Sequence, residues 1–189
     1  RAIAEHLYWS ILAEISQLAG QQNYIPQELK NLEHQLSDIY YGNFSLFQSL
    51  PDVWAIDQLF PIMPIHHLDE QPTRRAILSD ITCDCEGKID SFIGRTKAEY
   101  TLALHTLPKD EDYILGVFLV GAYQETLGDL HNLFGDTNVV SVSYDENGTC
   151  MLYNELDGDT VADVLSYVEY DPKKMESLIR QKAENAVRE

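Results

Sequence analysis

The β character of the chain is decided by one stretch, RRAILSDITCDCEGKIDSFI, which covers residues 74–93. Residues 74–83 are rich in Ile and Leu, as in a strand, and the turn-forming residues 84–88 follow them. Residues 89–93 begin and end with apolar residues, and we expect them to be the hairpin partner of the first strand. The sequence thus predicts a strand that ends at Cys83, with Asp84 beginning the turn.

Further strands are predicted downstream. Residues 100–107 alternate in polarity, and residues 113–122 are nearly all apolar, as in a strand buried on both faces. Residues 139–144 and 149–153 flank the turn Asp145-Glu146-Asn147-Gly148 and predict a hairpin. With one helical insert at residues 125–134, these strands indicate a small β-sandwich or barrel.

Helical patterns flank this region on both sides. Apolar residues recur at helical spacing over residues 2–19 and again to about Tyr41, which predicts a helical hairpin. Residues 160–168 and the residues after Asp171-Pro172 predict two C-terminal helices. We expect an α+β chain with a helical segment at 1–42, an irregular linker at 43–73, a β-domain at 74–155 and helices at 156–189.

The charge of the chain excludes two classes of partner. There are 31 acidic and 13 basic residues, a net charge of −18, and 14 acids but no Lys or Arg lie between Asp110 and Pro172. Nucleic-acid binding and docking on anionic lipid both need a basic face. A cationic small molecule suits this field, although surface acids also simply keep a protein in solution. The sequence has no apolar run long enough to cross a membrane.

The three cysteines are sparse and odd in number, which does not fit a disulfide framework. We therefore expect a reducing, cytoplasmic setting. Cys83 and Cys85, with His66 and His67 upstream, invite comparison with a zinc site. Their spacing does not match the usual Cys-x-x-Cys pattern, and there is no second pair. The identity of any metal ligands stays open.

Two other clusters carry possible chemistry. A thiol next to a carboxylate, as in Cys83-Asp84, can supply a proton beside a group that binds a cation, although a plain half-buried Cys and a turn-forming Asp fit as well. Tyr123 follows Gly121-Ala122 and can present its hydroxyl to a phosphate, or cap the core. His131 fits a pocket wall or the surface. We find no lysine in a clearly apolar strand that would form a Schiff base.

Several long stretches of the chain resemble the bacterial biosynthetic arginine decarboxylases. They occur in the family's order between about Asn43 and Asp171. They are Asn43–Asp52, Trp54–Pro61, Leu68–Pro72, Asp80–Asp84, Gly116–Glu125 and Gly128–Thr137.

The resemblance implies a fold-type III pyridoxal-phosphate enzyme of alanine-racemase-like architecture. Its (β/α)₈ barrel, with the Schiff-base lysine, is absent from this chain, which corresponds to the C-terminal β-sandwich or Greek-key domain and its helices. The implied reaction converts L-arginine to agmatine and CO2 in putrescine and spermidine biosynthesis. Pyridoxal phosphate, Mg²⁺ and a homodimer or higher homo-oligomer are implied as well, and the isolated fragment is expected to be inactive.

The resemblance also implies roles for four residues. Cys83 would donate a proton to the carbon that loses CO2, after reaching the partner's site across a dimer interface, and Asp84 would bind the guanidinium of arginine. Tyr123 would contact the cofactor phosphate, and His131 would lie near the substrate. Cys85 stands where the family pattern has Ser. Two alternatives remain: a non-catalytic interaction or regulatory module of the same fold, and a sister decarboxylase for ornithine or lysine.

Overall fold

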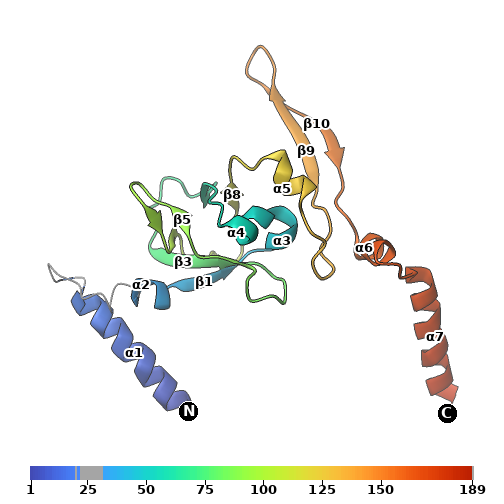
Figure 1. Cartoon of the computed structure of the whole chain (residues 1–189), viewed down its shortest axis with the longest axis horizontal. Helices are drawn as coiled ribbons and strands as arrows, with labels where there is room; N and C mark the ends of the chain where they lie inside the picture. The colour runs from blue at the N-terminus through green and yellow to red at the C-terminus, as the bar shows by residue number, and fades with distance from the viewer. Residues whose placement is uncertain (20, 22–31, 189) are drawn as a thin grey trace. The chain divides into compact units, whose positions relative to one another are not determined.

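The computed structural model describes residues 1–19, 21 and 32–188, and its helices and small sheets confirm the α+β class (Figure 1). The chain forms two compact units, each built from separated segments. Unit 1 comprises Arg1–Asn43, Asp57–Asp80 and Lys88–Val120, and unit 2 comprises Phe44–Ile56, Ile81–Gly87 and Gly121–Glu189. The four consecutive ranges given above remain an interpretation of the sequence.

Unit 1 is organised around strand β3 (Arg74–Ser79). On one side β3 pairs in parallel with β1 (Asp38–Tyr41), and on the other it pairs antiparallel with β4 (Lys88–Ile89) and β7 (Leu102–Leu104). The burial of β3 alternates, with Ala76 and Leu78 buried, as expected for a strand with one face in the core. The predicted strand at residues 74–83 is therefore confirmed over its first six residues.

The first helix of unit 1 is as predicted, and the described part of the predicted second helix is helical only at its beginning. Helix α1 spans Ala2–Ala19, and α2 is a single turn, Leu32–Gln35. Residues 22–31 lie outside the described residues. The prediction was wrong at residues 38–41, which form β1, because two β-favouring tyrosines follow Ile39 and the strand gains a ladder to β3. The Arg74–Asp38 ion pair, at 2.7 Å, holds the two strands in register.

The remaining strands of unit 1 are short. Strand β2 (Ile62–Pro64) pairs with β8 (Leu115–Val117), and β5 (Phe92–Ile93) pairs with β6 (Ala98–Glu99). The predicted hairpin partner, residues 89–93, is therefore divided, since only its first residue extends β4 against β3. The prediction that residues 113–122 form a strand buried on both faces was wrong: β8 has three half-buried residues, and positive φ at Leu119 breaks the extended run.

Unit 2 begins with two short helices, α3 (Leu46–Ser49) and α4 (Pro51–Ile56). Ser45 caps α3 by accepting a hydrogen bond from the Gln48 backbone N–H at 3.3 Å. Leu46 is fully buried and anchors α3 in the core of the unit. In α4 only Pro51, its first residue, is buried.

The predicted helical insert at 125–134 is displaced in the structure. Helix α5 spans Ala122–Thr126, and His131 and Phe134 then form an isolated antiparallel bridge. The prediction was wrong from Leu127 onward because the backbone finds other partners: the Asp129 N–H donates to the Phe47 carbonyl at 3.0 Å. Asn132 also has positive φ, which a helix does not accept.

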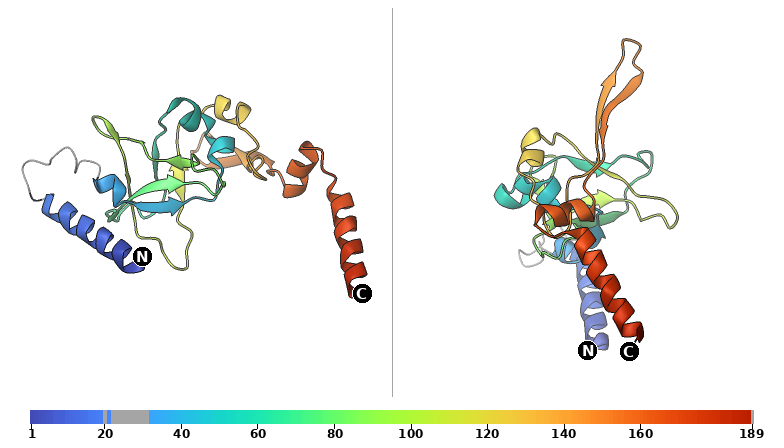
Figure 2. Two further views of the ribbon diagram at one scale, coloured as in Figure 1. Left: turned by 60° about the horizontal axis from the view of Figure 1, so that its bottom comes forward. Right: turned by 90° about the vertical axis from the view of Figure 1, so that its right-hand side faces the viewer.

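The C-terminal part of unit 2 has the secondary structure that the sequence predicts. Strands β9 (Val139–Tyr144) and β10 (Cys150–Leu156) form the predicted antiparallel hairpin, visible as the orange arrows of Figures 1 and 2. Helices α6 (Val161–Tyr167) and α7 (Pro172–Arg188) confirm the two predicted terminal helices. None of the helices in the described part of the chain has the length and apolarity needed to cross a bilayer.

Candidate functional site

The loop 81–87 carries Cys83 and Asp84, and it is closed by its own hydrogen bonds. Oδ1 of Asp84 accepts the Glu86 backbone N–H at 2.9 Å, and the Asp84 carbonyl accepts the Gly87 N–H at 3.2 Å. An Asp that bonds the backbone two residues on is a typical turn former. The indole N–H of Trp54 also donates to the Glu86 carboxylate, which ties the loop to α4. The loop therefore presents Cys83 and Asp84 from a closed turn.

Only one oxygen of the Asp84 carboxylate is used in this turn. Its Oδ2 has no bonding partner among the residues that the structure describes, and the side chain is half-buried. A carboxylate with one oxygen held by the backbone and one oxygen open is oriented for a cation outside the loop. This geometry suits the binding of a guanidinium group by Asp84.

Cys83 forms two hydrogen bonds with one side chain, Asn132. The Cys83 backbone N–H donates to Oδ1 of Asn132 at 3.2 Å, and Nδ2 of Asn132 donates to Sγ of Cys83 at 3.2 Å. The thiol is otherwise exposed. The structure thus joins the predicted Cys83 to the residue next to the predicted His131, from a segment 49 positions away in the sequence.

Aromatic rings support the segment that carries Asn132. The His131 imidazole is half-buried and stacks on Phe47 with ring centroids 4.2 Å apart, and Phe47 also meets Trp54 edge-on at 5.4 Å. The Phe134 N–H donates to the His131 carbonyl at 3.2 Å and closes a tight turn around Asn132. His131 lies beside the Cys83 loop, and its predicted contact with substrate stays a prediction.

Tyr123 lies apart from these contacts. It occupies the first turn of α5, after the N-cap Gly121, and 75% of it is exposed. Its hydroxyl has no hydrogen-bond partner among the described residues, and a Cβ added at Gly121 would meet open space. A free hydroxyl beside open backbone fits a contact with a phosphate oxygen. No contact is described between Tyr123 and Cys83, Asp84 or His131.

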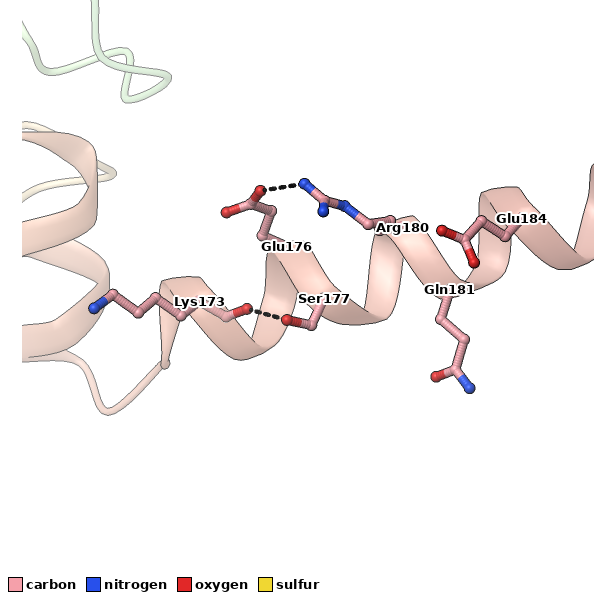
Figure 3. Close-up of a pocket in the computed structure, with 6 residues that line it drawn as sticks. All are labelled: Lys173, Glu176, Ser177, Arg180, Gln181 and Glu184. Carbon is pink, nitrogen blue, oxygen red and sulfur yellow. Dashed lines mark hydrogen bonds and ion pairs between the residues drawn. The ribbon is translucent and has the colours of Figure 1, made fainter.

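Two other features do not contribute to this site. No group of three or more His, Cys, Asp or Glu side chains in the described ranges is arranged to hold a metal ion. A shallow hollow lies along one side of α7, where Glu176 pairs with Arg180 at 3.2 Å (Figure 3). It is lined by Lys173, Glu176, Ser177, Arg180, Gln181 and Glu184, and none of these is a predicted site residue.

The family resemblance implies that Asn132, like His131, lies near the pocket, but it predicts no contact with Cys83, and it implies no role for Phe47 or Trp54. The available signal was weak, since an Asn after His gives no local sign that its amide reaches Cys83. Trp54 and Phe47 are spaced as core residues would be. Only the fold brings these side chains to the loop 81–87.

Comparisons with known proteins identify relatives of this chain. Residues 161–188 match the family model described as the arginine decarboxylase C-terminal helical extension. The chain is 58% identical over 178 residues to the biosynthetic arginine decarboxylase of Bacteroides thetaiotaomicron, covering 93% of this chain and 28% of that protein. It is 53% identical to the biosynthetic arginine decarboxylase 1 of Synechocystis, covering 99% of this chain and 28% of that protein.

A solved structure extends this likeness to three dimensions. The crystal structure of the biosynthetic arginine decarboxylase SpeA from Campylobacter jejuni superposes with a TM-score of 0.70 at 35% identity, over 96% of this chain and 32% of that chain. The chain belongs to the biosynthetic arginine decarboxylase family. It corresponds to the C-terminal part of these relatives and spans somewhat under a third of their length.

Proposed function

We propose that this chain forms one wall of the active site of a pyridoxal-phosphate-dependent arginine decarboxylase, which releases CO2 from L-arginine and yields agmatine for polyamine synthesis. The observation that carries the proposal is the loop 81–87, which presents an exposed thiol beside a carboxylate with one open oxygen. The names of the relatives point to arginine as the substrate.

The exposed hydroxyl of Tyr123 fits a requirement for pyridoxal phosphate. When bound, pyridoxal phosphate supplies the electron sink for the bond that releases CO2. Tyr123 would bind an oxygen of its phosphate through the free hydroxyl. The lysines of unit 2 lie on α7, at Lys173, Lys174 and Lys182. By family resemblance, the Schiff-base lysine would belong to another part of the enzyme. Mg²⁺ is proposed by family resemblance alone, and no residue here is assigned to it.

Two residues of the loop 81–87 have different proposed roles toward the substrate. Asp84 would bind the guanidinium of arginine through its open Oδ2 and so hold the α-carbon in reach of the loop. Cys83 would then deliver the proton that replaces CO2 on that carbon. Cys83 is exposed and Asp84 is half-buried in this chain, which suits a site completed by a partner subunit in a homodimer or higher homo-oligomer.

A substitution at Cys83 tests this proposal in the full-length enzyme. Cys83→Ala removes the proton donor, and general-acid catalysis is worth about a hundredfold or more, so kcat for CO2 release should fall by that factor. Cys85→Ala is the matched control, because Cys85 is also exposed on the same loop and has no assigned role. Full activity of Cys83→Ala would overturn the proposed role of the thiol.

The choice of substrate and the non-catalytic alternative are tested in the same assay. Arginine, ornithine and lysine are compared side by side with the unmodified full-length enzyme. Preferred release of CO2 from arginine supports the proposal, while preference for ornithine or lysine identifies a sister decarboxylase. No release from any of them identifies a non-catalytic relative of the same fold.

A further inference from the structure

The orientation of the Asn132 amide is fixed by the backbone of Cys83. A backbone N–H can only donate a hydrogen bond, so the atom of Asn132 that faces it must be the carbonyl Oδ1. The amide nitrogen Nδ2 then necessarily faces the sulfur, 3.2 Å away. Asn132 therefore donates to Sγ, and the thiol accepts.

This direction of bonding has a chemical consequence for the thiol. Because Sγ accepts from Nδ2, the proton on sulfur is not used in the bond to Asn132 and is free for a group outside the loop. The N–H of Asn132 also remains against the sulfur after that proton has left, where it stabilises the thiolate. If the amide had the opposite orientation, Oδ1 would accept a hydrogen bond from the thiol, and the thiol proton would not be free.

Asn132 is itself held in place from several directions. Its φ of 56° lies in the left-handed region, which Asn tolerates better than most residues. The preceding His131 is stacked on Phe47, and the Phe134 N–H closes the turn onto the His131 carbonyl. These contacts support the backbone on both sides of Asn132, and the two hydrogen bonds to Cys83 orient its amide.

We propose that Asn132 is the positioning residue of Cys83, which locates the sulfur and leaves the thiol proton available for the substrate carbon. The inference rests on the proposed function. In the step that it supports, the S–H bond breaks, a C–H bond forms at the carbon that has lost CO2, and the resulting thiolate is held by Nδ2 of Asn132. A proton from water then restores the thiol.

One conservative variant distinguishes a positioning role of Asn132 from a purely structural role. Asn132→Asp keeps the size of the side chain and the oxygen that accepts the Cys83 N–H, so the link between the two segments persists. It removes only the donor to sulfur and places a carboxylate there. A residue that merely ties the loop would tolerate this change, whereas a positioning residue would not.

The first experiment measures steady-state kinetics of full-length Asn132→Asp with arginine. We expect kcat to fall by about tenfold, as for loss of one strong hydrogen bond, with KM changed by less than about twofold. Asn154→Ala is the control, because Asn154 also has positive φ, at 54°, while its side chain makes no described hydrogen bond. An unchanged kcat, or an equal effect of Asn154→Ala, overturns the proposal.

A double-mutant cycle then asks whether Asn132 acts through Cys83. If it does, Asn132→Asp should lower kcat no further once Cys83→Ala is present, because the group that it positions is gone. Additive losses would show that Asn132 acts independently of the thiol and would overturn the inference. If Cys83→Ala alone keeps full activity, the proposed function of Cys83 fails, whatever the result at Asn132.

A third measurement needs no substrate and so separates the two proposals. Alkylation of the full-length protein by iodoacetamide is followed by mass spectrometry at each cysteine. With the donor removed and a negative charge beside the sulfur, alkylation of Cys83 should slow severalfold in Asn132→Asp. The exposed Cys85 and Cys150 are internal controls. An unchanged ratio of Cys83 to Cys85 labelling would contradict the contact itself.

Discussion

The turn contact of Asp84 and its proposed substrate contact fall on different oxygens of one carboxylate. Oδ1 accepts the Glu86 N–H at 2.9 Å and shapes the turn, while Oδ2 faces away from that bond. A substitution that keeps the turn but removes the charge can therefore separate structure from substrate binding. Asn is that substitution, since its carbonyl still accepts the backbone N–H.

Asp84→Asn in the full-length enzyme should lower kcat/KM for arginine by roughly 10- to 100-fold, because a charge-assisted bond to the guanidinium is lost. Asp145→Asn is the matched control: Asp145 also accepts a backbone N–H two residues on, from Asn147 at 2.8 Å, in an exposed turn. Equal kcat/KM for Asp84→Asn and the unmodified enzyme would exclude contact between Asp84 and the substrate cation.

Tyr123→Phe removes only the hydroxyl proposed to bind the cofactor phosphate. The apparent Kd for pyridoxal phosphate, read from the absorbance of the full-length enzyme, should rise severalfold, as expected for one lost hydrogen bond. Tyr144→Phe serves as the control, because Tyr144 on β9 is similarly exposed, at 72% against 75%. Identical cofactor affinity in all three proteins would remove Tyr123 from the phosphate site.

Sequence reasoning at the residue scale predicts roles for the groups with distinctive chemistry but not the contacts that support them. Cys83 and Asp84 stand out because a thiol and a carboxylate are adjacent in a turn. The family resemblance implies only that Asn132 lies near the pocket, and its contact with Cys83, 49 positions away, comes from the fold. Such long-range contacts leave no periodic signal in one sequence.

At the scale of elements, the part of the chain from Val139 onward was predictable because its signals are local. The turn Asp145-Glu146-Asn147-Gly148 joins β9 to β10, and Thr160 begins α6 with a capping box. Residues 38–41 were mistaken for helix because their strand is determined by pairing with β3, far along the chain. The segment after α5 was mistaken for the same reason, since its backbone bonds to Phe47.

The capping box of α6 gives this helix a defined pH dependence. The Thr160 hydroxyl and backbone N–H donate to Oδ2 of Asp163 at 2.6 and 2.9 Å, and these bonds, the hydroxyl bond most, lower the pKa of Asp163. Because the folded pKa lies below the unfolded one, the stabilisation is complete above the unfolded pKa. It is lost as pH falls through the folded pKa.

We therefore expect the protection factors of the α6 amides, measured by hydrogen exchange, to decline in acid as Asp163 takes up a proton. In Asp163→Asn the side chain no longer titrates, so this part of the pH dependence should disappear. A decline of the same size and midpoint in Asp163→Asn would show that another group is responsible.

At the scale of the whole molecule, the loop 81–87 and Tyr123 both belong to unit 2, and no contact between them is described. The net charge of −18 surrounds them with a field that suits a cationic substrate. In the proposed dimer, Cys83 and Asp84 serve the partner's active site, and we propose that Tyr123, which has no described contact with either of them, serves the site of its own subunit. Each chain then contributes to two sites, which a mixture of variants can reveal.

A mixed dimer of Cys83→Ala and Tyr123→Ala chains should regain activity. One of its sites combines the intact Tyr123 of the first chain with the intact Cys83 of the second, and the other site carries both defects. The two full-length chains are co-expressed with different affinity tags, purified through both tags and assayed for CO2 release at limiting pyridoxal phosphate. Activity above that of either parent is expected.

The control pairs Cys83→Ala with Asp84→Ala. These two residues are adjacent on one closed loop and must reach the same site together, so no site in that mixed dimer is intact and no activity should return. If the Cys83→Ala and Tyr123→Ala pair also fails to recover, the thiol and the tyrosine hydroxyl serve a single site. The loop 81–87 would then act within the same active site as α5. Another partner would have to cover the exposed Cys83 thiol.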